Sequence, residues 1–342
     1  MEKVIICIHG LGNKPSKELL TKWWQLSIRE GLISIGKYIF NPKIEMVYWA
    51  DLLYEKPLDE NITDPDNPFY LNDKFTKSPQ EVPTIKQETR KKVLGFIEKQ
   101  IDKLFLNEDS TINYGFISDF IIRKYFKDLG IYYDKKNDIN NNLCVRDIIR
   151  ERLSSLLNKY KNDEIFLIAH SMGTIVAYDV LSLELTEAKI NTFITIGSPL
   201  GIPIVISKTA AEYKKKFGKE FIPSTPENII KNWYNFSDLR DKVAMNFNLA
   251  DDFKGNNLEV KVTDVIITND YRINGEANPH KAYGYLRTPE FSKILFEFLI
   301  SDRNKIAILF MDLINKLEIW RLGKKIKYLK KVNPFLLNDI DL

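Results

Sequence analysis

Residues 164–177 read EIFLIAHSMGTIVA: an apolar run, a short turn that carries Ser171, and a second apolar run with small residues. This order predicts a buried strand, a sharp turn and a helix. The small residues Ala169 and Gly173 let strand and helix approach closely, so the serine is held on a strained corner. Free N–H groups and the dipole at the start of the helix would favour negative charge there. The alternative is a serine that only caps the helix.

The composition is that of a globular protein with one large domain or two small ones. The chain has 342 residues, of which 44% are hydrophobic and 28% charged, and its net charge is +4. So small a charge gives no reason to expect a nucleic-acid partner. Cys7 and Cys144 are far apart, which favours a reducing compartment, and we expect a cytoplasmic protein. We expect neither a signal peptide nor a membrane-spanning segment.

Strand and helix patterns alternate along most of the chain. Apolar strand patterns occupy residues 4–8, 44–49, 164–170, 192–197, 232–236 and 260–268. Helices are expected from the Ser16 cap to Gly31, over 143–160, after Gly173, and from Pro289 to about Ile300. This alternation predicts an α/β protein with one open, mostly parallel sheet and helices on both faces.

An insertion interrupts the alternation, so we expect a core formed by residues 1–50 and 143–300. The inserted residues 51–142 begin with an irregular loop rich in Pro, Asp and Asn, followed by helical apolar spacing over 93–105 and 116–125. Residues 134–142 are polar and are expected to form a surface loop. We interpret the insertion as a largely helical cap or lid over the carboxyl end of the sheet. A helical side domain without a part in catalysis is an equal alternative.

The tail, residues 301–342, contains an amphipathic pattern between Asn304 and Lys331. An apolar stripe is followed by a basic cluster: Ile306, Phe310, Leu313, Leu317 and Trp320, then Lys324, Lys325, Lys327, Lys330 and Lys331. Such a helix can lie on an anionic membrane surface. Packing on its own domain or on a partner helix is the favoured interpretation.

A nucleophilic serine needs a base, a residue that orients the base, and donors for the oxyanion. The chain has three histidines. His170 adjoins the serine and is expected to point away from it, and His9 ends the first strand. His280, in the loop after the last strand, is left as the base. The acid is expected after the penultimate strand, where Asp238 and Asp241 are both candidates.

These motifs resemble the α/β-hydrolase superfamily, and within it the lipase- and esterase-like serine hydrolases. The turn around Ser171 is similar to their Gly-x-Ser-x-Gly nucleophile elbow, with Ala169 in place of the first glycine. The resemblance covers roughly residues 1–50 and 143–300. It places the histidine after the last strand, where His280 lies. It favours Asp241 as the acid, because Val243 follows two residues later, and it leaves Asp238 as the alternative.

The resemblance extends to His9-Gly10-Leu11-Gly12 after the first strand, which is similar to the oxyanion loop of lipases and esterases. Carried over, the N–H groups of Leu11 and Met172 would stabilise the oxyanion. His9, Gly10, His170 and Gly173 would support the site without carrying protons. The alternative is an ordinary glycine turn between strand and helix, which is compatible with the same residues.

The expected activity is that of a serine hydrolase acting on a carboxylic ester, either a small molecule or a lipid. An amidase or peptidase would use the same machinery. A non-catalytic receptor that keeps the hydrolase fold is the alternative of a different class. We expect no cofactor and no metal site, because the three histidines have other roles and Gly10-Leu11-Gly12 lacks the third glycine of a dinucleotide-binding loop.

Overall fold

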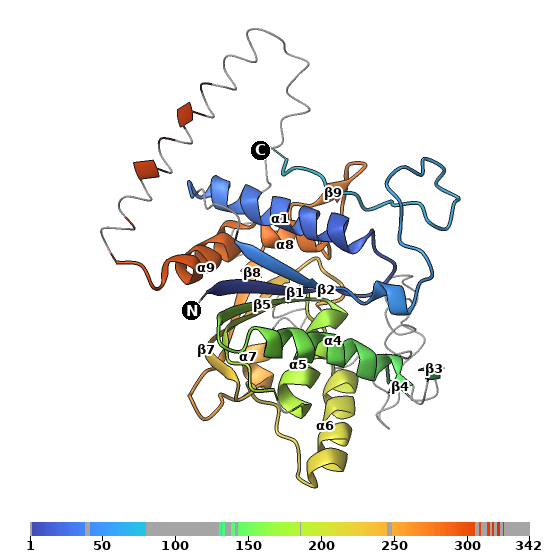
Figure 1. Ribbon diagram of the computed structural model, residues 1–342, viewed down its shortest axis with the longest axis vertical. Helices are drawn as coiled ribbons and strands as arrows, with labels where there is room; N and C mark the ends of the chain where they lie inside the picture. Colours follow the sequence, from blue (N-terminus) through green and yellow to red (C-terminus); the bar gives the residue numbers. More distant parts are fainter. Residues whose placement is uncertain are drawn as a thin grey trace.

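A six-stranded parallel sheet forms the centre of the molecule, in the order β2-β1-β5-β6-β7-β8. The computed structural model describes residues 2–37, 42–79, 130, 132–133, 138–140, 143–184, 186–244 and 248–304, with isolated positions up to 324. The sheet strands are β1 Lys3–Ile8, β2 Lys43–Val47, β5 Glu164–His170, β6 Ile190–Ile196, β7 Ile229–Asp238 and β8 Val262–Ile267. The predicted fold class is confirmed (Figure 1).

Both faces of the sheet are covered, which explains why the central strands β1 and β5 are nearly continuous apolar runs. In β1, Ile5 and Cys7 belong to one hydrophobic cluster, while Val4, Ile6 and Ile8 belong to the other. Successive side chains of a strand point to opposite faces, so a central strand between two helical layers is buried on both sides.

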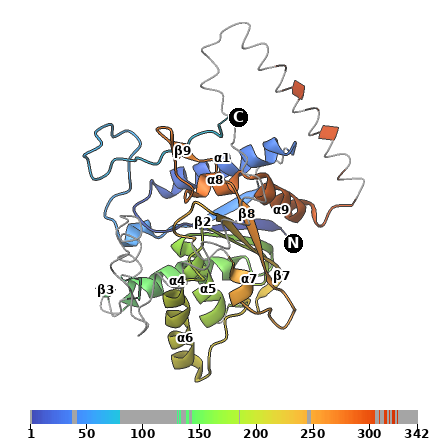
Figure 2. The same cartoon turned by 180° about the vertical axis from the view of Figure 1, so that it is seen from behind.

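Two layers of helices enclose the sheet, with α1, α8 and α9 on one face and α4, α5, α6 and α7 on the other (Figures 1 and 2). The helices are α1 Lys17–Ser34, α4 Val145–Lys159, α5 Met172–Leu183, α6 Pro203–Phe217, α7 Leu249–Asp252, α8 Ala282–Leu286 and α9 Pro289–Ile300. The Ser16 hydroxyl accepts a hydrogen bond from the Leu19 N–H at 3.3 Å and caps α1 as expected. The helix continues three residues beyond the predicted end at Gly31.

The structure also differs from the prediction around the last strand. The last strand begins at Val262 and not at residue 260, because the Asn256 side chain accepts the N–H groups of Leu258 and Val260 and fixes a turn there. The predicted loop 269–280 contains a hairpin, β9 Arg272–Ile273 paired with β10 Glu276–Ala277. Its turn is Asn274-Gly275, both with positive φ, a frequent hairpin sequence that the prediction missed.

Of the inserted residues 51–142, the described segment 51–79 starts in the short helix η1 Ala50–Leu52 and continues as an irregular segment, as predicted. It leaves the sheet edge and crosses the side of α1 and α8 (Figure 1). Phe75 packs edge-on against Tyr283 of α8, with ring centroids 5.8 Å apart. Within the predicted polar loop 134–142, β3 Asp138–Asn140 pairs with β4 Leu143–Cys144.

Other expectations concern residues outside the described part of the chain. The proposed helices over 93–105 and 116–125 lie there, so the cap remains a prediction. Most of the tail also lies there. Three described positions of its apolar stripe, Leu313, Leu317 and Trp320, are 55%, 49% and 57% exposed. About half of each of these three side chains is therefore accessible, and the packing of the tail stays a prediction.

Candidate active site

Ser171 forms the corner between β5 and α5. Its backbone has φ 55° and ψ −130°, a left-handed conformation that L-residues rarely adopt. The Ser171 N–H donates to the Ile196 carbonyl at 3.0 Å, which ties the corner to β6. The residue is 2% exposed and does not cap α5 with its side chain. Its hydroxyl is therefore directed away from the helix that it precedes, unlike that of a capping serine.

Two glycines make this corner possible. A Cβ on Gly10 would lie 2.5 Å from Ser171 Cβ and 3.0 Å from its Oγ. A Cβ on Gly173 would lie 2.7 Å from the carbonyl oxygen of His9 and 2.8 Å from that of Ile8. Such distances exclude any side chain at either position without movement of the backbone. Ala169, where the superfamily pattern has glycine, is fully buried in the core.

His280 joins Ser171 to Asp241. Its Nε2 lies 2.9 Å from Ser171 Oγ, and its Nδ1 lies 2.8 Å from Asp241 Oδ2 and 3.0 Å from Oδ1. A carboxylate only accepts, so Nδ1 carries the proton and Nε2 is free to accept the serine proton. The three residues come from the ends of β5, β7 and the loop after β8, at one edge of the sheet. The structure therefore brings together the three side chains proposed from sequence.

Asp241 and Asp238 have different partners, although both are buried. Asp241 Oδ1 accepts the N–H of Val243 at 2.9 Å and that of Ala244 at 3.4 Å. Asp238 ends β7, and its carboxylate binds the Arg240 guanidinium at 2.6 Å and the Asn269 N–H at 2.6 Å. Of the two candidate acids, Asp241 is the one that contacts His280. Asp238 fixes the turn after β7, in agreement with its interpretation as a turn residue.

The loop that carries His280 is held at three successive carbonyls. The Asn269 side-chain amide donates to the carbonyls of Pro279 at 2.9 Å and Lys281 at 2.8 Å. His170 Nε2 contacts the carbonyl between them, that of His280, at 2.7 Å. Sequence reasoning missed Asn269, and its position directly after the last strand was the available signal. The His170 side chain is directed at the His280 carbonyl and not at the serine hydroxyl, as expected, and so holds His280 through its backbone.

Burial keeps His170 neutral. It lowers the pKa of His170 well below 6.5, and the nearby His280, Lys14 and Lys281 lower it further. The His170 and His280 rings are 4.9 Å apart. A neutral His170 donates its Nε2 proton to the loop carbonyl and places no positive charge beside His280.

His9 is also neutral and braces the first loop. Burial, the largest cause, lowers its pKa to about 3, and Lys14 acts in the same direction. Its Nε2 accepts the Trp49 N–H at 3.0 Å, and its Nδ1 donates to the Gly10 carbonyl at 2.7 Å. The Trp49 ring stacks on the imidazole, with centroids 4.8 Å apart. These contacts agree with a structural role for His9.

The expected oxyanion donors are the N–H groups of Met172 and Leu11. Met172 is the first residue of α5, where a backbone N–H has no acceptor within the helix. Leu11 follows Gly10, whose Cα packs against Ser171. The Lys14 ammonium binds the carbonyls of Leu11 and Gly12, and Gly12 has φ 81°. The carbonyls of Leu11 and Gly12 therefore face the Lys14 ammonium, so a positive charge lies beside this loop.

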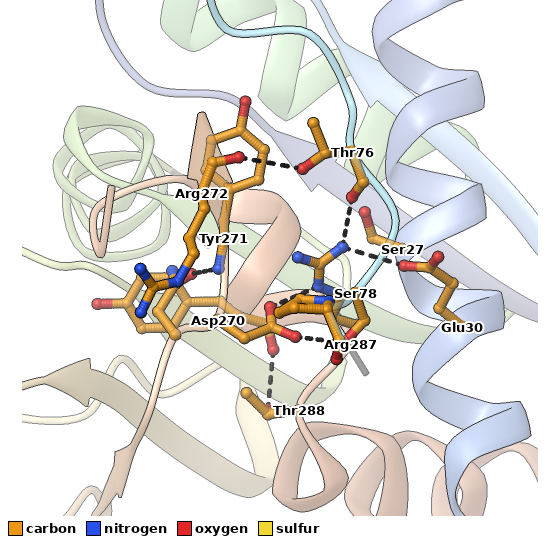
Figure 3. A network of polar contacts seen from close by, with 12 residues as sticks. Ser27, Glu30, Thr76, Ser78, Asp270, Tyr271, Arg272, Arg287 and Thr288 are labelled. Atoms are coloured by element: carbon orange, nitrogen blue, oxygen red, sulfur yellow. Dashed lines mark hydrogen bonds and ion pairs between the residues drawn. The ribbon is translucent and has the colours of Figure 1, made fainter. Parts of the chain in front are cut away.

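A second polar network fixes the chain on both sides of His280, at Asp270 before it and at Arg287 after it (Figure 3). The buried Arg287 guanidinium binds Asp270 at 2.6 Å, the Thr76 carbonyl at 2.6 Å and Glu30 of α1 at 3.1 Å. Lys281, next to His280, pairs with Asp73 at 3.0 Å. Residues 73–76 of the insertion therefore bind the segments on both sides of His280.

The described ranges contain neither a candidate metal centre nor a candidate membrane span. No group of three or more His, Cys, Asp or Glu in these residues could hold a metal ion. Among the helices that the structure describes, none combines the length and apolar character needed to cross a membrane.

The comparisons with known proteins agree with the architecture. Residues 138–243 match the family model of a PGAP1-like alpha/beta domain. No curated protein and no solved structure matches the chain significantly. The matched range includes the nucleophile elbow and Asp241, and it ends before His280. The six-stranded parallel sheet and this match together show a fold of the α/β-hydrolase type.

Proposed function

We propose that the protein is a serine hydrolase that cleaves carboxylic esters through an acyl-enzyme. The observation that carries the proposal is the continuous hydrogen-bonded chain from Ser171 Oγ through His280 to Asp241. A serine hydroxyl is a weak nucleophile unless a positioned base takes its proton, and the base must itself be oriented.

In the first half-reaction, Ser171 Oγ attacks the ester carbonyl carbon while His280 Nε2 takes the hydroxyl proton. Asp241 stabilises the resulting imidazolium. The carbonyl oxygen becomes an oxyanion, which the N–H groups of Leu11 and Met172 stabilise. When the tetrahedral intermediate collapses, the C–O bond to the alcohol breaks and His280 gives its proton to the departing alkoxide. The products are an acyl-Ser171 ester and a free alcohol.

In the second half-reaction, water replaces the alcohol. His280 takes a proton from the water as its oxygen attacks the acyl carbon, and a second oxyanion forms in the same place. Its collapse breaks the bond to Ser171 Oγ, which recovers a proton from His280. The carboxylic acid leaves and the enzyme is restored.

The test is covalent labelling by a fluorophosphonate, followed by assay of p-nitrophenyl esters of increasing acyl length. Wild-type protein is expected to be labelled at Ser171 and to hydrolyse at least one ester. Ser171→Ala is expected to abolish both while its urea unfolding transition stays close to that of the wild type. A folded wild-type protein that the probe does not label would overturn the proposal and favour a receptor.

A further inference from the structure

We infer that Tyr285 is a positioning residue of this site, which hydrogen-bonds the acid Asp241 and sets how strongly that acid holds the base. The inference rests on the proposed function. Tyr285 lies in α8, five residues after His280, so one short segment supplies both the base and a second partner for the acid. The Tyr285 hydroxyl lies 2.8 Å from Asp241 Oδ2, the same oxygen that lies 2.8 Å from His280 Nδ1.

The direction of the Tyr285 hydrogen bond is fixed by its other partner. The Asp238 backbone N–H points at the Tyr285 oxygen, 3.1 Å away. A backbone N–H can only donate, so the phenol oxygen accepts there. The phenol proton is therefore free for Asp241 Oδ2, which as part of a carboxylate can only accept. Tyr285 thus links the end of β7 to the acid through one donated and one accepted bond.

Burial keeps Tyr285 a donor. The residue is fully buried, and burial together with the adjacent Asp241 raises its pKa well above 10. The Asp241 side chain is also fully buried, so no solvent competes for its oxygens. Hydrogen bonds to a charged group are stronger than those between neutral groups. A phenol held in this place stabilises the Asp241 charge and reduces its pull on the His280 proton.

The surrounding charges stay the same when the Tyr285 hydroxyl is changed. His170 faces the His280 ring, and Lys14 and Lys281 lie close enough to affect His170. Lys281 is paired with Asp73, and Asp238 with Arg240. Among these residues, only Asp238 bonds to the Tyr285 side chain, and it does so through its uncharged backbone N–H. A shift in the pH profile of a Tyr285 variant therefore reports the bond to Asp241.

Tyr178 provides a matched control. Its buried hydroxyl donates to the Ser224 carbonyl at 2.8 Å and accepts the Ser224 N–H at 3.4 Å. It therefore also donates one bond and accepts one from a backbone N–H, but it has no contact with the three site residues. Tyr178→Phe is expected to cost similar stability to Tyr285→Phe and to leave the pH profile unchanged.

The experiment measures the rate of fluorophosphonate inactivation as a function of pH, so no natural substrate is needed. Loss of the phenol proton lets Asp241 hold the imidazolium more strongly, so His280 is protonated at higher pH. Tyr285→Phe is expected to raise the midpoint of the acid limb by about one pH unit, which lowers the rate on that limb about tenfold. Replacing Tyr285 with 3-fluorotyrosine, a more acidic phenol of nearly the same size, is expected to lower the midpoint.

The two variants keep the inference testable if one of them folds poorly. An unchanged or lowered midpoint in folded Tyr285→Phe would overturn it, as would an unchanged or raised midpoint with 3-fluorotyrosine. Failure of the wild-type protein to react would instead overturn the proposed function. A reactive wild type with unshifted variants would leave the hydrolase proposal standing and remove only the role of Tyr285.

Discussion

Ser171 and His280 reach their shared hydrogen bond from two differently built parts of the molecule. On the serine side, backbone packs directly on backbone: Gly173 lies against the last carbonyls of β1, and the Ser171 N–H binds β6. On the histidine side, side chains hold a loop, chiefly Asn269 and Arg287. Backbone atoms of a sheet cannot move independently, so steric contacts between them are hard to relieve. A side-chain hydrogen bond, in contrast, can be removed by a single substitution. The two sides should therefore respond differently to substitution and to pH.

The largest effect is expected from Arg287→Met on the histidine side. The Arg287 side chain is 2% exposed, and its loss would leave Asp270 and Glu30 without their shared cation. Removing one partner of a buried ion pair typically costs about 3–5 kcal/mol of unfolding free energy. Burial raises the pKa of Glu30, so protonation would relieve part of that cost. Urea unfolding measures the loss, and the fluorophosphonate rate should fall as the His280 loop loosens.

Arg152→Met is the control for Arg287→Met. Arg152 pairs with Asp51 at 2.6 Å, but the two side chains are 34% and 50% exposed. Exposed pairs contribute about 0–1 kcal/mol, because water screens them. Equal losses in the two variants would show that the Arg287 network does not hold the histidine side.

Part of this contrast is visible in the sequence. The strands of the sheet, the elbow and its glycines follow from apolar runs and small residues that are adjacent in the chain. Asn269 and Tyr285 could not be found that way, because their partners are set by the folded arrangement. Tyr285 is 44 positions from Asp241. In the sequence, Asp241 was preferred over Asp238 because of the resemblance to lipases and esterases. The structure shows the difference directly, since Asp241 contacts His280 and Asp238 contacts Arg240 and Asn269.

A pair of glycine substitutions compares the two sides directly. A Cβ on Gly173 meets backbone oxygens of β1, which cannot move without the sheet, so Gly173→Ala should cost about 1–3 kcal/mol of unfolding free energy. A Cβ on Gly284 would lie 1.7 Å from Asn269 Oδ1 and 2.5 Å from its Cγ, and this side chain can rotate away only by giving up its bonds to the His280 loop. Gly284→Ala should cost less stability but release the His280 loop, lowering the fluorophosphonate rate about tenfold, or about 1.4 kcal/mol in the barrier.

Gly130→Ala is the control for this pair, because a Cβ there meets nothing within 4 Å. Urea unfolding and labelling kinetics of the three variants give the comparison. A larger stability loss for Gly284→Ala than for Gly173→Ala would contradict the distinction between backbone and side-chain obstacles. So would a Gly284→Ala variant that reacts at the wild-type rate.

The smallest effect concerns pH and the contact that joins the two sides, from His170 of β5 to the His280 carbonyl. The unfolded chain binds a proton at His170 near pH 6.5, whereas burial keeps the folded residue neutral to a much lower pH. Below pH 6.5, unfolding therefore takes up a proton at His170. The contribution of neutral His170 to the free energy of unfolding is at its maximum above that pH. It falls by about 1.4 kcal/mol per pH unit as the pH drops toward the folded-state pKa.

His170→Gln should remove this dependence, because its amide can donate to the same carbonyl and does not titrate. Urea unfolding at pH 7.5 and 5.5 should show a decrease about 1.4 kcal/mol smaller in the variant than in the wild type. His9, with its pKa lowered to about 3, and the buried carboxylates contribute equally to both proteins and cancel in the difference. Equal decreases would mean that His170 accepts a proton in the folded state. A neutral His170 bonded to the His280 carbonyl would then no longer explain how the serine side and the histidine side are joined.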